Sequence, residues 1–397
     1  MATRRAQVGI IFLTILIDMI GFGIVIPVLP LYAEKFGATA VQNGALVAIF
    51  SLAQFIAAPI WGKISDRVGR KPVLFISTLG TALGFLWMGL AGALWMLFLA
   101  RLIDGVAGGN VGTAQAYVAD ISAPEDRAKF MGLIGAAFGI GFMIGPAIGG
   151  IMTAKFGLHS PMFLAAGLAL LNAILIFAIL PESLPPERRG HQKRASVFAV
   201  LHHSDRRLYL LTTATYFLFT TGFSMLTFVF VLFLFHRFDI DAFGTGNLFF
   251  MIGFIGVLIQ GVLIGRLVKR FGEARLATAG GAILAGSLFA LPFATGWPSL
   301  ILFSAGIAVG NSLSMPALSG LVSRSVHADW QGRGLGLYQS SAALARWIGP
   351  AVAGLLLAVD VPRAREFYAQ TPLWTGAGLV AISVVLTLQL PRSLREN

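Results

Sequence analysis

Residues 62–71 read Gly62-Lys63-Ile64-Ser65-Asp66-Arg67-Val68-Gly69-Arg70-Lys71, a short basic stretch between two long apolar runs. The runs cover about residues 42–62 and 72–91. Each has the roughly 20 residues that a helix needs to cross about 30 Å of hydrocarbon. The glycines allow a tight turn, Asp66 can cap a helix or pair with a cation, and the cations favour the cytoplasmic side of a membrane. The stretch therefore predicts a cytoplasmic turn between two transmembrane helices.

Similar apolar runs recur along the 397 residues, of which 57% are hydrophobic and only 12% are charged. A chain of this composition cannot cover a water-soluble globule with polar surface. The runs are continuous and contain Gly and Pro, which favours helices over the alternating strands of a membrane barrel. We predict an all-α integral membrane protein with twelve transmembrane helices. Their expected ranges are 8–32, 42–62, 72–91, 94–118, 129–153, 160–180, 208–235, 245–265, 275–295, 298–322, 333–358 and 370–390.

The formal charge of +12 at pH 7 would suit a nucleic-acid-binding protein, but the positions of the cations argue against one. Most of the 29 Lys and Arg residues fall in the N-terminus and in every second predicted loop. By the positive-inside rule, these loops and both termini are expected in the cytoplasm. We therefore expect a multi-pass protein of the plasma (inner) membrane, monomeric, in contact with lipid and without a nucleic-acid partner.

Enzymatic and metal chemistry find no support in the sequence. There is no cysteine, and the six histidines fall in or beside predicted loops. No Ser/His, His/Glu or paired-carboxylate arrangement lies within the predicted spans, and the loops are too short for an enzymatic domain. We therefore expect no catalytic residues, no metal and no cofactor.

The two halves of the chain repeat each other. The turn that begins at Gly62 reappears as Gly265-Arg-Leu-Val-Lys-Arg-Phe-Gly272, and Gly145-Pro146 reappears as Gly349-Pro350. The two offsets are 203 and 204 residues, so a chance match is improbable. Parallel repeats predict two pseudo-symmetric six-helix bundles with a cavity between them at mid-depth. The expected domains are an N-terminal bundle at 1–180, a cytoplasmic linker at 181–207 and a C-terminal bundle at 208–397.

The basic turn closely resembles the motif A loop of the major facilitator superfamily, Gly-x-x-x-Asp-Arg/Lys-x-Gly-Arg/Lys-Arg/Lys. The resemblance extends over essentially the whole chain and implies the major facilitator fold. In that family an Asp, an Arg and an acidic residue that ends helix 4 latch the cytoplasmic side, which implies this role for Asp66, Arg70 and Asp120. Without the resemblance, the turn indicates only a solvated loop that obeys the positive-inside rule. The matching positions are Gly62, Asp66, Arg67, Gly69, Arg70 and Lys71.

The predicted helix at 129–153 is rich in glycine. Small residues four apart let two backbones approach closely and Pro permits a bend, so the bare pattern indicates helix packing. The pattern also resembles motif C, Gly-x-x-x-Gly-Pro-x-x-Gly-Gly, which within the family marks drug:proton antiporters. The residues concerned are Gly135, Gly139, Gly141, Gly145, Pro146, Gly149 and Gly150.

The best overall match within the family is to the twelve-helix drug:proton antiporters, and among them to the tetracycline/proton antiporters. Asp18, followed by two prolines, is similar to motif D, and Arg101 with Gly105 is similar to motif B. The tetracycline group typically carries an acidic residue within helix 3 and another within helix 9. Residues 72–91 and 275–295 contain none, which argues against tetracycline itself as the substrate.

Four ionisable residues fall clearly inside the predicted spans: Asp18, Arg101, Asp104 and Arg346. Each costs about 2.5–3.5 kcal/mol on insertion scales, so such groups face a cavity or a partner. A neighbouring guanidinium favours the ionised carboxylate, and moving it away loads a proton. We expect Asp18 or Asp104 to carry the proton and Arg101 to modulate it. The alternative is a permanent pair of Arg101 with either Asp that only holds helices together.

Other polar residues within the spans are candidates for the wall of a substrate cavity, although each can equally serve an interhelical hydrogen bond. For Arg346, a substrate-facing role and a structural bond to backbone carbonyls both remain open. The candidates are Gln54, Asn110, Gln115, Asn247, Asn311, Gln339 and Arg346.

These observations predict a proton-coupled secondary transporter that exports drugs or other amphipathic small molecules by alternating access. One alternative is a symporter or facilitator for a small anionic metabolite, with Arg101 and Arg346 clamping its carboxylate. A membrane receptor that transports nothing is the other.

Overall fold

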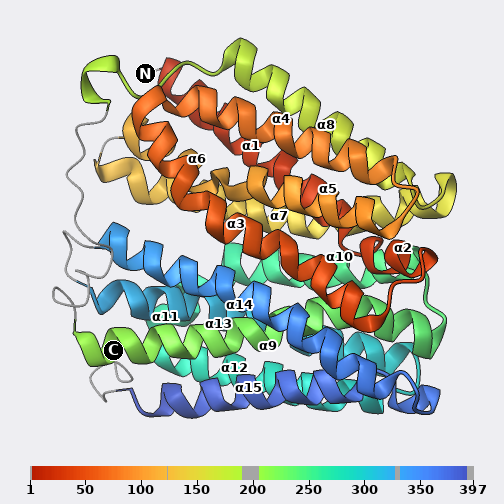
Figure 1. Cartoon of the computed structure of the whole chain (residues 1–397). Coiled ribbons are helices and arrows are strands. Elements are labelled where there is room, and N and C mark those ends of the chain that lie inside the picture. Colours follow the sequence, from red (N-terminus) through yellow and green to blue (C-terminus); the bar gives the residue numbers. More distant parts are fainter. Residues whose placement is uncertain (1, 123, 190–204, 327–330, 391–397) are drawn as a thin grey trace. The chain divides into compact units, whose positions relative to one another are not determined.

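The computed structural model describes residues 2–122, 124–189, 205–326 and 331–390. Helices account for most of these residues and run alongside one another within each half of the chain (Figure 1). The basic segment of the predicted linker at 190–204 lies outside the described residues. The first half contains α1 (Ala2–Val25), α2 (Leu29–Lys35), α3 (Ala40–Val68), α4 (Arg70–Gly89), α5 (Leu94–Ala107), η1 (Gly108–Asn110), α6 (Val111–Ile121), α7 (Pro124–Phe156), α8 (Ser160–Ile179) and η2 (Pro186–Arg188). The second half contains α9 (Arg206–Phe238), α10 (Ala242–Leu258), the π-helix η4 (Ile259–Leu263), α11 (Ile264–Phe271), α12 (Glu273–Ala290), η5 (Leu291–Phe293), α13 (Trp297–Arg324), α14 (Gln331–Asp360), η7 (Arg365–Phe367) and α15 (Gln370–Leu388).

Among the described residues, eleven helical segments are long and apolar enough to cross a membrane, and the bent pair α1 and α2 supplies the twelfth. The prediction of twelve transmembrane helices is thus confirmed. The first predicted span is not one straight helix, because α1 and α2 are inclined by 42° at a break that contains Pro27. Proline lacks the amide hydrogen that an unbroken helix needs. The fourth span is interrupted by the 3-10 turn η1, at Gly108 and Gly109, and the eighth by η4.

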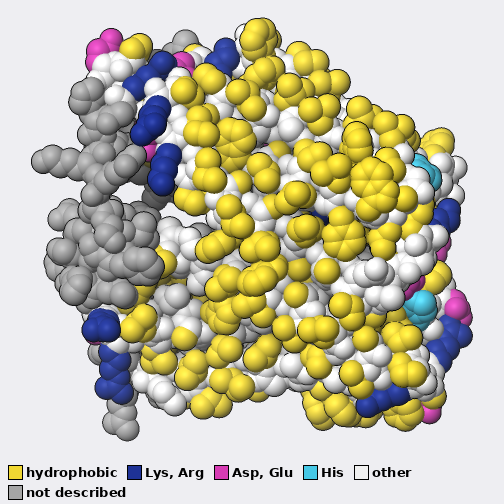
Figure 2. All heavy atoms as spheres, in the orientation of Figure 1, with side chains coloured by type: hydrophobic (Ala, Val, Ile, Leu, Met, Phe, Trp, Pro, Cys, Tyr) yellow, Lys and Arg dark blue, Asp and Glu magenta, His cyan; other side chains and the backbone are white. Residues whose placement is uncertain are grey.

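The surface agrees with a membrane location. Figure 2 shows one face, on which hydrophobic side chains cover a broad band while charged side chains lie near two opposite edges. Large apolar residues such as Phe177, Leu302 and Trp95 have more than half of their side-chain surface exposed. In water this exposure would oppose folding, whereas lipid accommodates it without cost.

The chain forms two compact units. Unit 1 comprises Met1–Ala38, Ile49–Lys193 and Asp241–Phe250, and unit 2 comprises Thr39–Ala48, Arg194–Ile240 and Met251–Asn397. The boundary between the units at Lys193 falls inside the linker predicted at 181–207. The start of α3 belongs to unit 2, and the start of α10 belongs to unit 1.

Glycines let the helices of unit 1 approach at backbone distance. Along α7, Gly141, Gly145 and Gly149 face the backbone of α1 between Met19 and Ile24. A methyl group at Gly149 would collide with the carbonyl oxygen of Ile24. Of the remaining motif C glycines, Gly150 is buried, whereas Gly135 has nothing within 4 Å of the position that a Cβ would take.

Unit 2 uses the corresponding position in the same way. Gly349, the repeat counterpart of Gly145, lies on α14 against Thr221 and Ser224 of α9. The Ser224 hydroxyl donates a hydrogen bond to the carbonyl oxygen of Ala345, at 3.1 Å. The repeated Gly-Pro sequence therefore supports close helix packing in both halves.

We predict that Gly149→Ala destabilises the protein while Gly135→Ala, on the same helix, does not. Overpacking of a tight contact typically costs about 1–3 kcal/mol, so the thermal unfolding midpoint of Gly149→Ala in detergent should fall by several degrees. Fluorescence-monitored unfolding of both purified variants measures this difference. Equal midpoints for the two variants would contradict the packing described for α1 and α7.

Candidate functional site

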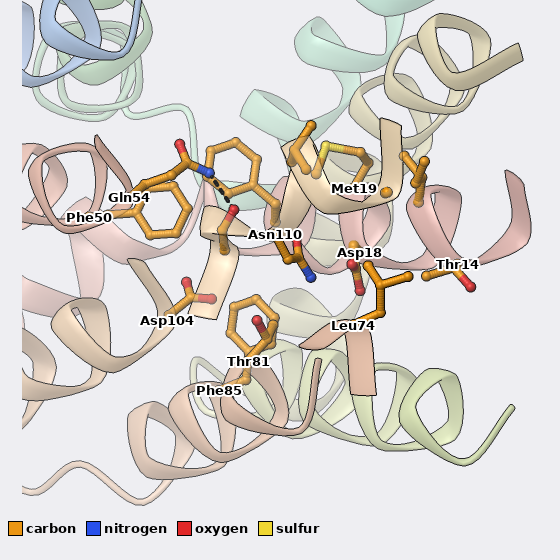
Figure 3. Close-up of a pocket in the computed structure, with 15 residues that line it drawn as sticks. Thr14, Asp18, Met19, Phe50, Gln54, Leu74, Thr81, Phe85, Asp104 and Asn110 are labelled. Atoms are coloured by element: carbon orange, nitrogen blue, oxygen red, sulfur yellow. Dashed lines mark hydrogen bonds between the residues drawn. The ribbon is translucent and has the colours of Figure 1, made fainter. Parts of the chain in front are cut away.

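Unit 1 contains a cavity of about 50 Å³ between α1, α3, α4, α5 and α6. Figure 3 shows that the carboxylates of Asp18 and Asp104 belong to its wall. One ordered water needs about 10–15 Å³ of such space, so the cavity has room for water molecules and is too small for a drug-sized ligand. Polar side chains along the wall come from Thr14, Asp18, Gln54, Thr81, Asp104 and Asn110.

Asp18 lies near the middle of α1 and is held by a neighbour from α8. The Asn172 amide donates a hydrogen bond of 2.9 Å to Oδ1 of Asp18 and one of 3.1 Å to the carbonyl oxygen of Thr14. Asn172 is completely buried, whereas Asp18 is partly accessible. The amide therefore fixes one carboxylate oxygen of Asp18 while the side chain keeps access to the cavity.

Asp104 and Arg101 form an ion pair one helical turn apart on α5. The Arg101 guanidinium donates a hydrogen bond of 2.9 Å to Oδ2 of Asp104, and each residue is only 3% exposed. The Cζ atom of Arg101 also lies 4.1 Å from the centre of the Phe50 ring, a cation–π contact. Arg101 thus pairs with Asp104, and its Nε, which is buried, has no hydrogen-bond partner among the described residues.

A second charged cluster surrounds Arg70 at the start of α4. Its guanidinium lies 2.7 Å from an oxygen of Asp66 and 3.3 Å from an oxygen of Asp120. Asp120 is the second-to-last residue of α6. Arg70 is 3% exposed and also donates to the Ser65 hydroxyl. The three residues that the resemblance to motif A groups together therefore lie within ion-pair distance.

Glu182, just after α8, joins this cluster to the chain that follows. Its carboxylate accepts hydrogen bonds of 2.8 and 3.2 Å from the backbone amides of Arg70 and Lys71. These amides open α4 and have no partner within the helix. Gly69 precedes them with φ at 112°, a conformation that glycine adopts readily, and a Cβ at this position would collide with Glu182.

The second half repeats this arrangement with the charges exchanged. Gly272, the counterpart of Gly69, has φ at 78° and precedes Glu273 at the start of α12. Glu273 occupies the position of Arg70 in the repeat, and Arg324 is the last residue of α13, as Asp120 lies near the end of α6. Glu273 and Arg324 form an ion pair of 3.0 Å. Both halves therefore join the same two helix ends by opposite charges, in reversed order.

The candidate cavity residues are found in different settings. Gln54 donates a hydrogen bond of 2.8 Å to the carbonyl oxygen of Gly108, and Asn110 donates one of 2.8 Å to the Ser77 hydroxyl. Both of these residues line the cavity of unit 1. The others do not line it: Gln115, Asn247 and Gln339 are exposed, and Asn311 and Arg346 are partly buried.

Asn172, Glu182 and the pair of Glu273 with Arg324 were missed at the level of sequence. Asn172 is the single amide in the apolar run 160–180, and this isolation was a usable signal, because a polar side chain at bilayer depth requires a partner. The Glu273 pair could have been found by extending the repeat from its glycines to the charges beside them. Glu182 gave no such signal.

Similarity to known proteins identifies the family of this chain. A sequence model of the Major Facilitator Superfamily matches residues 11–350 and also residues 212–397. The chain belongs to the Major Facilitator Superfamily. It is 32% identical over 387 residues to the tetracycline resistance protein, class C, of Escherichia coli, covering 95% of this chain and 94% of the relative. It is 32% identical over 360 residues to multidrug resistance protein 2 of Bacillus subtilis (strain 168), covering 89% of each.

A solved structure agrees with the family assignment. The human organic anion transporter MFSD10 (TETRAN) superimposes with a TM-score of 0.73 at 27% identity, covering 97% of this chain and 99% of the other. As a member of the Major Facilitator Superfamily with such relatives, the chain is a membrane transport protein, and the resemblance to that superfamily is confirmed.

We predict that Arg324→Glu destabilises the protein and that the double exchange Glu273→Arg with Arg324→Glu restores most of the loss. Two carboxylates at this distance repel each other, and a pair of this exposure is worth about 1 kcal/mol or less. Arg275→Glu, at an exposed position near the start of α12, makes the same change of net charge and is the control. The thermal unfolding midpoints of these variants are compared with that of the wild-type protein. If the double exchange is no more stable than Arg324→Glu alone, loss of the Glu273–Arg324 ion pair is not the cause of the destabilisation.

Proposed function

We propose that this protein exports amphipathic drugs in exchange for protons by alternating access. The observation that carries the proposal is the cavity of unit 1, whose wall contains the carboxylates of Asp18 and Asp104. A carboxylate at mid-depth persists where it serves an ion or proton pathway. The names of the curated relatives, a tetracycline resistance and a multidrug resistance protein, support the same function.

The two carboxylates have different neighbours and hence different proposed roles. Asp104 pairs with the charged guanidinium of Arg101, while Asp18 accepts a hydrogen bond from the neutral amide of Asn172. A rearrangement that separates Arg101 from Asp104 would load a proton on Asp104, and the reverse movement would release it. Asp18, beside water-sized space, is then the group that exchanges protons with the cavity.

The charged cluster at the start of α4 is proposed as the cytoplasmic gate. Its ion pairs with Arg70 link the ends of α3, α4 and α6, so opening this region of unit 1 would require breaking several contacts together. Both termini are proposed to lie in the cytoplasm, in a monomer within the inner membrane. We assign a transport function and no catalytic reaction.

The substrate is proposed to be an amphipathic drug other than tetracycline. The tetracycline group carries acidic residues within helices 3 and 9, and the corresponding interiors of α4 and α12 have none. Without these carboxylates, a cationic or metal-complexed substrate would lack the counter-charges that these two helices supply in the tetracycline group.

One observation favours a second candidate, the transport of an organic anion together with protons or without them. Among the described residues, the guanidinium of Arg346 interacts electrostatically with Tyr216 and has no carboxylate partner, whereas Arg101 is engaged by Asp104. The solved relative named as an organic anion transporter points in the same direction. The direction of proton movement separates this candidate from antiport.

We predict that Asp18→Asn and Asp104→Asn each lower proton-driven transport at least tenfold, because an amide cannot carry the proton. The purified protein is reconstituted in liposomes with an imposed pH gradient, and a panel of fluorescent cationic, neutral and anionic drugs is followed with and without a protonophore. Glu366→Gln, an exposed carboxylate in η7, is the matched control.

Protonophore-sensitive movement of a drug against the proton flow would establish antiport. Movement in the direction of the protons would favour the anion symporter. Full proton-driven transport by both Asp variants would overturn the roles proposed for these residues, and failure of the wild-type protein to move any compound would favour a receptor.

A further inference from the structure

The membrane interior of the second half contains one positive charge and no described negative one. Arg346 lies at the middle of α14, and the acidic residues described between 205 and 390 all lie at helix ends or in connections. Unit 1, by contrast, supplies a partner for each mid-depth charge, since Arg101 has Asp104 and Asp18 has Asn172. The acidic residues that the structure describes in the second half are Asp205, Asp239, Asp241, Glu273, Asp360 and Glu366.

An aromatic platform lies beside this charge. The rings of Tyr216 on α9 and Tyr338 on α14 stack with centres 3.8 Å apart and an interplanar angle of 16°. They are 5% and 1% exposed. The guanidinium of Arg346, two helical turns after Tyr338, is close enough to Tyr216 for an electrostatic interaction. The cation and the two rings thus form one cluster inside unit 2.

The cluster also has an unused hydrogen-bonding group. The buried Tyr338 hydroxyl lies near that of Tyr216 but makes no hydrogen bond of ordinary geometry with any described residue. A buried hydroxyl without a partner is costly, and such groups are usually satisfied. The guanidinium of Arg346 is partly buried and carries five N–H donors, with no carboxylate partner among the described residues.

The surrounding helices hold the cluster in place. Gly349 packs against Thr221 and Ser224, and the Ser224 hydroxyl bonds the carbonyl oxygen of Ala345, the residue before Arg346. Nearer the start of both helices, the Tyr209 hydroxyl donates a hydrogen bond of 2.8 Å to the carbonyl oxygen of Gly334. The contact of α9 with α14 is therefore tied on both sides of the stacked rings, and Arg346 is positioned by rigid elements.

We propose that Arg346, Tyr216 and Tyr338 bind the acidic group of a planar aromatic anion, and that such anions are the substrate class of this transporter. A guanidinium binds a carboxylate through two parallel hydrogen bonds, and a tyrosine hydroxyl adds a third donor. The stacked rings give the surroundings of Arg346 an aromatic character, which suits an aromatic acid better than an aliphatic one. A cationic compound would meet the uncompensated charge of Arg346 instead. The inference rests on the proposed transport function and extends it to the ligand.

Binding of three matched probes tests the proposal: anthracene-2-carboxylate, its methyl ester and 2-(aminomethyl)anthracene. Their fluorescence is titrated with the full-length protein in lipid nanodiscs, where no proton gradient is needed. We expect the carboxylate to bind at least tenfold more tightly than the ester or the amine. Arg346→Gln should remove that preference while the weak binding of the ester changes less than twofold. Arg346→Lys should recover part of it.

Two further variants separate the proposed site from a general loss of folding. Tyr338→Phe keeps the stacking but removes the donor, so we expect a loss of carboxylate affinity of about three- to tenfold. Arg275→Gln, at an exposed position near the start of α12, should leave all three affinities unchanged. Equal binding of the three probes, an unchanged preference in folded Arg346→Gln, or no binding of the carboxylate to the wild-type protein would overturn the proposal.

Failure of this inference can be distinguished from failure of the antiport mechanism. Arg346-dependent binding of the carboxylate without gradient-driven export would refute antiport and retain the site. Proton-driven export of cationic drugs that is unaffected in Arg346→Gln would retain antiport and refute the site.

Discussion

Hydrocarbon offers no hydrogen-bond partner, and the rest of this structure depends on that constraint. Backbone groups within the spans are satisfied by helices, and breaks in the helices occur near Pro27, at the two glycines of η1 and at the π-helix η4. Side chains obey the same requirement. Asn172 holds Asp18, and Arg101 holds Asp104, because an isolated charge at this depth would be costly.

The repeat shows which features of the helix junctions are required and which can vary. Both halves keep a glycine of positive φ between two helices, at Gly69 and Gly272. Both also keep an ion pair between the helix that follows this glycine and a distant helix end, but Arg70 with Asp120 is replaced by Glu273 with Arg324. The geometry needs a pair of opposite charges, and either order satisfies it.

The interiors of the halves have not kept the same symmetry. Unit 1 has two carboxylates, one guanidinium and water-sized space. In the described part of unit 2, a single guanidinium lies beside two stacked tyrosines. This difference suits a division of labour in which one half handles protons and the other recognises the transported molecule.

Much of the fold followed from the sequence alone. Hydrophobic length determined the number of spans, and glycine spacing at Gly62, Gly145 and their counterparts revealed the repeat. The same reasoning selected Asp18, Arg101, Asp104 and Arg346, because charges are rare in apolar runs. These features are local or periodic, so one chain is sufficient to read them.

Only the tertiary structure decided which of these groups meet. Asn172 reaches Asp18 across 154 residues, Glu182 caps α4 across 112 residues, and Tyr216 stacks on Tyr338 from another helix. An all-round apolar helix has no amphipathic stripe that would reveal its inward face. The face that each side chain presents is therefore determined by packing between distant helices, which length, composition and spacing do not encode.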